Sequence, residues 1–403
     1  MKNEEKRFSL FPLVTPSFGS DEVKEAVDSL LTTYVTMGKK CIQFETDFAK
    51  YIGVKHGLLV NSGSTANLIA LSILSSPKIP NKIKPGDEII ASAVTWSTTV
   101  FPIYDIGAIP VFIDSDPETM TINIDQIEDV ISEKTKAIMP VHLLGNPCDM
   151  NAILKIANKY KLHVIEDCCE AHGAKIGDRM IGSFGHLNTF SFFFSHHIST
   201  IEGGMFLTDN TEFYQIGKSL RAHGWIRERD DQKSIVNKNP NYDPRFLFIH
   251  RGFNVRPTEI QGAFGIHQLP KLEGFIQTRE MAALFLNEHL EKYSEFIHIP
   301  KIIDKVRQSW FGYSIIVKQD APFTRNELSM HLENNGIETR PIMGGNFVEQ
   351  PVMSELEYRT SNSLPNSQHI FHNGIFIGLH HKLEKHILKK IVRIFYNFFD
   401  NYT

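Results

Sequence analysis

Apolar residues in the first half of the chain recur at two alternating spacings. From residue 20 to 31 they return every three or four positions behind Ser20, which predicts a helix that begins near this serine. The same spacing returns in residues 66–74 and 153–160. Short apolar runs bounded by turn residues predict strands instead. These runs occupy residues 56–60, 87–91, 109–113, 137–142 and 162–166.

Strands that alternate with helices of this length form βαβ units. They build a mostly parallel sheet whose two faces are covered by helices. We therefore expect an α/β fold. Ligands on such sheets bind at the carboxyl ends of the strands. The residues that carry the chemistry should follow the apolar runs directly.

The second half of the chain predicts a change of architecture. Residues 226–250 are rich in charged and amide side chains and predict a long loop. A helical stretch near residues 257–290 leads into a smaller region, in which residues 310–317 predict a strand and 325–334 a helix. We predict two domains. They are a large domain of residues 1–260 and a smaller α+β C-terminal domain of residues 261–403.

Composition narrows the classes of function. The chain has 403 residues and a formal net charge of −4, so it offers no broad basic surface for nucleic acid or an anionic membrane. A local basic pocket for a phosphate-bearing ligand remains compatible with this charge. No stretch approaches the roughly 18 consecutive apolar residues of a membrane span, and the charged start is unlike a secretory signal. We expect a cytoplasmic protein without nucleic-acid or membrane partners.

The four cysteines are too few to cross-link a chain of this length. Cys41, Cys148, Cys168 and Cys169 are best explained as reduced thiols in a cytoplasmic protein. No Cys-x-x-Cys pair or spaced Cys/His array predicts a metal ion or an iron–sulfur cluster.

Three segments carry candidate chemistry. Residues 61–66 join the first strand to a helix start, and their small side chains suit either a phosphate or a plain helix cap. Residues 166–173 close a buried strand with three acids and a histidine. A carboxylate there can pair with a protonated pyridine nitrogen, cap a loop or bind a metal. Residues 190–197 form an aromatic run that ends in paired histidines, which are more often incidental than functional.

Together these segments resemble the DegT/DnrJ/EryC1/StrS family of sugar aminotransferases, which have the aspartate aminotransferase (type I) fold. The resemblance begins at Pro16 and ends at Pro341. Between them it takes in residues 44–49, the Ser62-Gly63-Ser64 turn, Glu166-Asp167, Glu202-Gly203-Gly204, and Asn254-Val255-Arg256 with Glu259 and Gln261. The resemblance implies pyridoxal 5′-phosphate (PLP) as cofactor.

His196 stands where this family carries the lysine that forms a Schiff base with PLP. No lysine lies between Lys175 and Lys218, so a small shift in alignment does not restore one. Histidine carries protons near neutral pH but does not form a stable Schiff base. The run Ser195-His196-His197 resembles the nucleotide-sugar 3-dehydratases of this family. A related branch binds a [2Fe–2S] cluster through downstream cysteines, but residues 206–403 contain no cysteine.

The dehydratase subgroup implies a reaction on a nucleotide-linked 4-keto-6-deoxyhexose, with GDP-4-keto-6-deoxy-D-mannose as the expected substrate. The C3 hydroxyl would be removed on pyridoxamine 5′-phosphate (PMP), which L-glutamate would regenerate. Two alternatives stay open. One is an aminotransferase that tolerates histidine and leaves an amino group on the sugar. The other is a PLP-binding regulator that has lost catalysis.

The resemblance also implies which residues hold the cofactor. Gly63, Ser64 and Ser191 would bind its phosphate. Trp96 would stack on the pyridine ring, although a tryptophan here can equally serve packing. Asp167 would pair with the ring nitrogen.

The remaining implied roles concern the reaction and its partners. Glu170 would lie near the cofactor 3-hydroxyl, and His196 would be the catalytic acid/base. Asn254 would reach the cofactor phosphate of the neighbouring subunit, in a homodimer that shares its active sites. Arg221, His223 and Arg340 are candidates for substrate contact, with surface salt bridges as the alternative for the two arginines.

Overall fold

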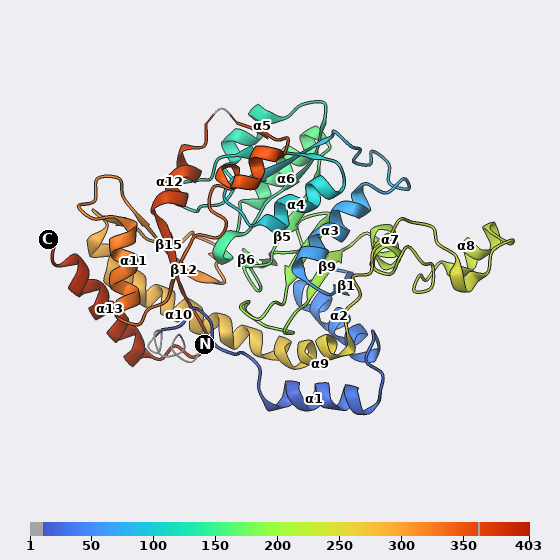
Figure 1. Ribbon diagram of the computed structural model, residues 1–403, viewed down its shortest axis with the longest axis horizontal. Coiled ribbons are helices and arrows are strands. Elements are labelled where there is room, and N and C mark those ends of the chain that lie inside the picture. Colours follow the sequence, from blue (N-terminus) through green and yellow to red (C-terminus); the bar gives the residue numbers. More distant parts are fainter. Residues whose placement is uncertain (1–10, 362) are drawn as a thin grey trace.

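The computed structural model describes residues 11–361 and 363–403. In this part of the chain the largest sheet has eight strands in the order β1-β9-β8-β5-β4-β2-β3-β14 (Figure 1). The strands span β1 His56–Val60, β2 Glu88–Ser92, β3 Ile109–Ile113, β4 Thr135–Met139, β5 His163–Asp167, β8 Leu187–Ser191, β9 Gly204–Thr208 and β14 Arg359–Thr360. Strand β9 runs antiparallel to both neighbours, whereas the other pairs are parallel. The predicted α/β class with a mostly parallel sheet is confirmed.

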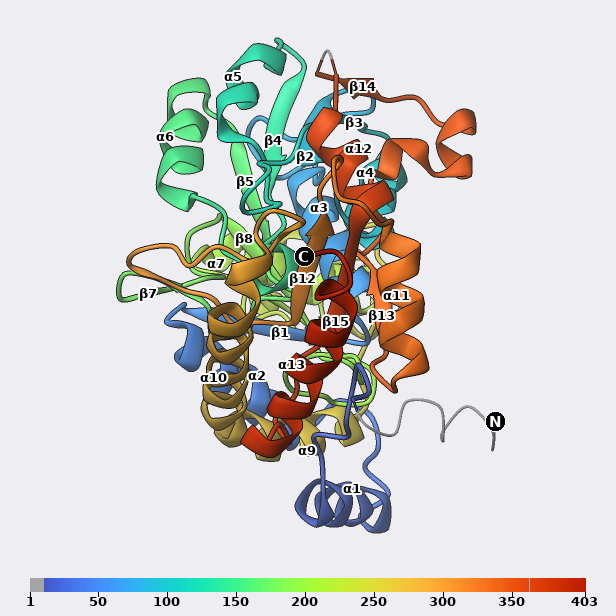
Figure 2. The ribbon, with the colours of Figure 1, turned by 90° about the vertical axis from the view of Figure 1, so that its left-hand side faces the viewer.

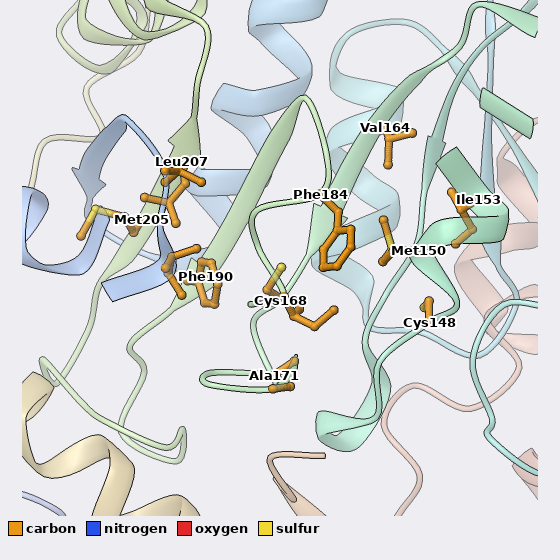
Figure 3. Close-up of a cluster of buried hydrophobic side chains, with 14 of the residues drawn as sticks. Cys148, Met150, Ile153, Val164, Cys168, Ala171, Phe184, Phe190, Met205 and Leu207 are labelled. Atoms are coloured by element: carbon orange, nitrogen blue, oxygen red, sulfur yellow. The ribbon is translucent and has the colours of Figure 1, made fainter. Parts of the chain in front are cut away.

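Helices cover both faces of this sheet, because its strands are buried along nearly their whole length. On one face α2 and α6 pack against residues such as Leu59, Val164 and Phe190, part of which Figure 3 shows. On the other face α3, α4 and α7 pack against Leu58 and Ile165. The helices from residue 20 to residue 268 span α1 Ser20–Leu31, α2 Lys39–Ile52, α3 Gly63–Leu74, α4 Ser97–Asp105, α5 Ile127–Val130, α6 Met150–Tyr160, α7 Thr211–Arg221, α8 Gln232–Lys238 and α9 Glu259–Gln268.

A second, smaller sheet has four antiparallel strands in the order β10-β12-β15-β13. Helices α10, α11 and α13 share its core (Figure 2). These elements span β10 Ile297–His298, β12 Gly312–Val317, β13 Thr339–Pro341, β15 Gly374–Gly378, α10 Leu272–Leu290, α11 Arg325–Asn334, α12 Pro365–Asn373 and α13 Lys385–Phe399. A small third sheet joins β6 Lys175–Ile176, β7 Arg179–Met180 and β11 Val306–Arg307.

The two ends of the chain interleave the two regions. Phe11 lies in the core of the small sheet and bridges to Ile337. Strand β14, from the C-terminal part, extends the large sheet beside β3. The division near residue 260, which falls at the start of α9, stays a prediction.

The predicted loop at residues 226–250 contains one element that the sequence did not indicate. Helix α8 forms there and projects from the body of the molecule (Figure 1). None of its residues is buried, so the sequence has no apolar stripe there that would predict a helix. No helix among the described residues is long and apolar enough to cross a membrane.

Candidate active site

A cavity of about 690 Å³ lies at the carboxyl ends of the central strands. Eight of the eleven residues singled out from the sequence line it. They are Gly63, Ser64, Trp96, Asp167, Glu170, Ser191, His196 and Arg340. Its walls come from both sheets, because Phe311 and Phe376 of the smaller region also face it. The position agrees with the rule for open parallel sheets.

One corner of the cavity is the N-terminus of α3. Ser62 caps this helix and accepts the Thr65 backbone N–H at 3.2 Å, which leaves the amides of Gly63 and Ser64 without helical partners. A Cβ at Gly63 would lie 2.5 Å from Ser191 Cβ, so only glycine permits this approach of helix and strand. Free amides, a helix dipole and the Ser191 hydroxyl together suit a phosphate group.

A second close approach brings the segment that carries His196 to the same corner. A Cβ at Gly204 would lie 2.1 Å from the carbonyl oxygen of Ser62. The Gly203-Gly204 pair therefore allows β9 to start directly beside the phosphate corner. The segment before it, residues 192–203, is thereby held over the cavity.

Asp167 lies deep in the cavity at the end of β5. Its Oδ2 accepts two hydrogen bonds, from Asn67 Nδ2 at 2.9 Å and Thr99 Oγ1 at 2.8 Å. Its Oδ1 accepts one backbone donor among the described residues, the Cys169 N–H at 3.2 Å. A carboxylate oxygen has two lone pairs, so Oδ1 can accept one more donor, such as a protonated pyridine nitrogen.

The supports of Asp167 were not found from the sequence. Asn67 is fully buried in α3, where its amide also donates to the Thr98 carbonyl and its oxygen accepts the Thr189 hydroxyl at 2.6 Å. A polar residue within the apolar run of residues 66–74 was the available signal. The network fixes the direction of the carboxylate before any ligand arrives.

Trp96 and Glu170 add an apolar surface and an acid to the cavity. Trp96 precedes α4, and half of its large ring is exposed (52%) although it is apolar. Glu170 is buried and accepts the Leu144 backbone N–H at 2.6 Å. Burial raises the pKa of Glu170 to about 8. At neutral pH its carboxyl group therefore keeps a proton and can donate a hydrogen bond.

His196 lies in the segment between β8 and β9, with its backbone N–H on the Phe193 carbonyl at 3.0 Å. Its Nδ1 is buried and has no hydrogen-bond partner among the described residues, so Nε2 is the ring nitrogen that reaches the cavity. Burial, aided by the charge of Arg279, lowers the pKa of His196 to about 3. The ring is therefore neutral and can accept a proton.

The structure does not bring three of the predicted residues to the cavity of their own chain. Asn254 is exposed, and its Oδ1 accepts a hydrogen bond from Arg256. Arg221 is buried in ion pairs with Glu45 at 2.6 Å and Glu228 at 2.7 Å. For Arg221 the expected substrate contact has no support in this geometry, because these carboxylates already occupy its guanidinium.

His223 has a backbone φ of +61° and packs on Trp225, also away from the cavity. Arg340 does line the cavity, at the edge of the small sheet in β13, and pairs with Glu338 at 2.7 Å. Its half-exposed side chain remains available to a ligand.

The acidic segment after β5 also contains a buried group that resembles a metal site. His142, Glu166 and Cys168 offer ligand atoms within 4.8 Å of one another. Yet Glu166 accepts the backbone N–H groups of residues 182, 184 and 185 and pairs with His142 Nε2. These four contacts use the lone pairs of the carboxylate. Glu166 therefore caps a loop, one of the roles considered for this segment.

Comparisons with known proteins identify the family of this chain. Residues 16–396 match the DegT/DnrJ/EryC1/StrS aminotransferase family. A GDP-4-keto-6-deoxy-D-mannose 3-dehydratase from Yersinia pseudotuberculosis is 40% identical over 373 residues, which cover 92% of this chain and 94% of that protein.

Two solved structures of GDP-4-keto-6-deoxymannose-3-dehydratase, each 36% identical, have the same fold. A mutant with bound GDP-perosamine has a TM-score of 0.89 and matches 95% of this chain and 99% of its own. The other, with a trapped PLP–glutamate geminal diamine, has a TM-score of 0.88 and the same coverage. The fold is that of the PLP-dependent aminotransferases of type I. The chain belongs to the DegT/DnrJ/EryC1/StrS aminotransferase family.

The support of Asp167 by Thr99 is testable. We expect Thr99→Val to weaken PLP binding by roughly 10-fold, because the Thr99 hydroxyl donates to Asp167 and orients the carboxylate that meets the ligand. Absorbance titration at neutral pH measures the affinity. Thr95→Val is the matched control, since the Thr95 hydroxyl is buried without a partner among the described residues. Equal affinities for the two variants would contradict the role of Thr99.

Proposed function

We propose that this protein is a PLP/PMP-dependent dehydratase that removes the C3 hydroxyl of a nucleotide-linked 4-keto-6-deoxyhexose. The favoured substrate is GDP-4-keto-6-deoxy-D-mannose, and L-glutamate is the co-substrate. One observation carries the proposal: a neutral histidine, His196, stands in the lysine position of a cavity that otherwise suits a pyridoxal cofactor. The relative from Yersinia supports the reaction, and the two solved structures support the glutamate and GDP-sugar ligands.

The overall reaction balances without a further reductant. The sugar loses one oxygen atom from C3 and is reduced by two electrons. Glutamate is oxidised by two electrons and gives 2-oxoglutarate and ammonia, which together contain the oxygen that the sugar loses. When bound, the aminated cofactor supplies the amine that condenses with the sugar ketone and the electron-withdrawing ring that makes the C3–O bond labile.

The residues of this chain bind and orient the cofactor. Gly63, Ser64 and Ser191 would hold its phosphate at the start of α3. Asp167 would meet its ring nitrogen through Oδ1, which the network of Asn67 and Thr99 leaves available.

Two further residues define the ring environment. Trp96 would cover the ring and exclude water from it. Glu170, which keeps its proton at neutral pH, would donate a hydrogen bond to the 3-hydroxyl oxygen.

His196 moves the proton that the elimination requires. Its neutral ring accepts a proton at Nε2 and donates one to the C3 hydroxyl oxygen, which departs as water. A lysine here would instead serve as a covalent partner and favour transfer of the amino group to the sugar. Arg340, at the cavity edge, is the remaining candidate for substrate contact.

Product analysis separates the three functions considered for this chain. We expect protein incubated with PLP, L-glutamate and GDP-4-keto-6-deoxy-D-mannose to release ammonia and 2-oxoglutarate. Mass spectrometry should find a sugar lighter by one oxygen atom. A 4-amino sugar would establish the aminotransferase instead. Absence of turnover on a panel of 4-keto nucleotide sugars, with PLP bound, would favour the non-catalytic regulator.

The histidine can be tested by restoring the family's residue. We expect His196→Lys to lose dehydration by more than roughly 10³-fold, because a lysine bound covalently to PLP replaces the free histidine that carries the proton. It should also bind PLP covalently, seen as a stable mass increase after borohydride reduction. His196→Asn is the control and should lose activity without the mass increase. Dehydration retained in His196→Lys would refute the assigned role of His196.

We propose that the protein works as a homodimer with shared active sites. Helix α1 turns its apolar face outward. Its polar residues Glu22 and Ser29 are buried on the side that packs against α9. That face carries Val23, Val27, Leu30 and Leu31, the last with 79% of its surface exposed. Apolar surface of this kind marks an interface. Asn254 would then serve the partner's cavity.

We place the enzyme in the cytoplasm, where its four unpaired thiols stay reduced.

Charge on the α1 face should separate the subunits. We expect the double variant Val27→Glu/Leu30→Glu to sediment as a monomer and to lose activity, whereas the wild type sediments as a dimer. Met330→Glu is the control, since Met330 is also an exposed apolar residue but lies on α11. A double variant that remains dimeric would exclude α1 from the interface.

A further inference from the structure

Behind His196, away from the cavity, lies a buried cluster of polar side chains without partners. His172 is fully buried, and neither of its ring nitrogens forms a hydrogen bond with a described residue. The Nδ1 atoms of His196 and His197 are buried and unpartnered in the same way. The ring centre of His172 lies 6.1 Å from that of His196 and 5.2 Å from that of His197. Buried polar atoms normally have partners, either protein groups or ordered water.

The protonation of this cluster can be worked out from its one fixed contact. His197 Nε2 lies 2.8 Å from the Ser309 carbonyl oxygen, which only accepts hydrogen bonds. Nε2 therefore carries the proton. Burial lowers the pKa of His197 well below its ordinary value, so the ring is neutral. Its Nδ1 is then a bare acceptor that faces the cluster.

The same reasoning extends to His172. Burial lowers its pKa well below the ordinary value, so this ring also has one N–H and one bare nitrogen. The candidate acceptors for the N–H are His197 Nδ1, on the ring whose centre lies 5.2 Å away, and the nearby Ser191 carbonyl. In either case the other nitrogen of His172 needs a donor. The neighbouring ring that can supply this donor is His196, whose ring N–H has not been assigned to another acceptor.

We propose that His172 is a positioning residue for His196. His172, His197 and the Ser309 carbonyl form a chain of acceptors and donors, bridged by ordered water, that keeps the His196 proton on Nδ1. The lone pair of His196 Nε2 then faces the cavity, as a catalytic base requires. This inference rests on the proposed function for its consequence in catalysis, but the tautomer itself does not depend on it.

The surrounding charges keep the three histidines neutral. Arg279, from α10, points its guanidinium at the Trp310 and Phe311 carbonyls, both at 3.1 Å, and forms no ion pair with a described residue. Its positive charge disfavours a second positive charge on His172, His196 or His197.

His380, which follows β15, feels the same charge. The acids Asp167, Glu170 and Glu202 line the cavity on which His196 opens. Elsewhere His172 is enclosed by the rings of Phe48, Phe190 and Phe192. A residue that only filled space here would not need to be histidine.

The tautomer can be read directly in the protein without ligands. Ring ¹⁵N chemical shifts of histidine-labelled protein distinguish a protonated from a bare nitrogen, and His196→Asn identifies the signals of His196. We expect wild-type His196 to carry its proton on Nδ1. In His172→Phe this preference should be lost, because phenylalanine accepts nothing. In His172→Gln it should persist, because the amide oxygen can accept.

Kinetics provide the second readout. We expect His172→Phe to lower kcat by roughly 10- to 100-fold with little change in KM, as when a residue that orients a catalytic group is lost. His172→Gln should recover most of this loss. His163→Phe is the control, since His163 packs against His186 away from the cavity.

Three results would overturn the proposal. They are a wild-type His196 with its proton on Nε2, an unchanged tautomer in His172→Phe, and equal kcat losses in the Phe and Gln variants. If the Phe variant does not fold, the wild-type spectrum and the Gln variant still decide. A wild type that shows the Nδ1 tautomer but no dehydration would leave the positioning role of His172 standing and refute only the proposed function.

Discussion

The active site depends on the close approach of three backbone segments at the end of β1. Helix α3 starts against Ser191 at Gly63, and β9 starts against Ser62 at Gly204. Both contacts exclude a side chain at the glycine. Because of them, the free amides of α3, the end of β8 and the segment with His196 meet in one corner. A change in either glycine would displace the phosphate corner and the histidine together.

Burial acts differently on the ionisable groups of the cavity. The Asp167 carboxyl oxygens accept three hydrogen bonds. This arrangement suits a carboxylate that binds a cationic group. Glu170, three residues later, receives one and keeps its proton at neutral pH. His196 is held neutral by burial and by Arg279. One small volume thus contains a carboxyl group surrounded by donors, a neutral acid and a neutral base, each set by its own neighbours.

Much of the fold could be predicted from the sequence, because the strands of the large sheet are buried on both faces and read as apolar runs. Strands β1, β2, β3 and β5 lie within one residue of their predicted positions. Strand β8 reads Leu-Asn-Thr-Phe-Ser, and because polar residues interrupt it, no apolar run marks it. Helix α8 lacks a buried face, so no periodicity marks it.

For the site, too, local patterns could be predicted and contacts between distant segments could not. The order of motifs in one chain was enough to indicate Asp167 and His196, but partners such as Asn67, Thr99 and His172 are set by three-dimensional contacts between distant segments.

The exposed apolar face of α1 has a consequence if it forms the proposed subunit interface. A free subunit would then present this face to water from Val23 to Leu31, and association would compete with non-specific aggregation. If subunits pair through α1, then mass action couples folding to association, and the midpoint of unfolding rises with protein concentration. Thermal stability would then be a property of the solution as well as of the fold. The amount of enzyme made in a cell would in part set how long each copy survives.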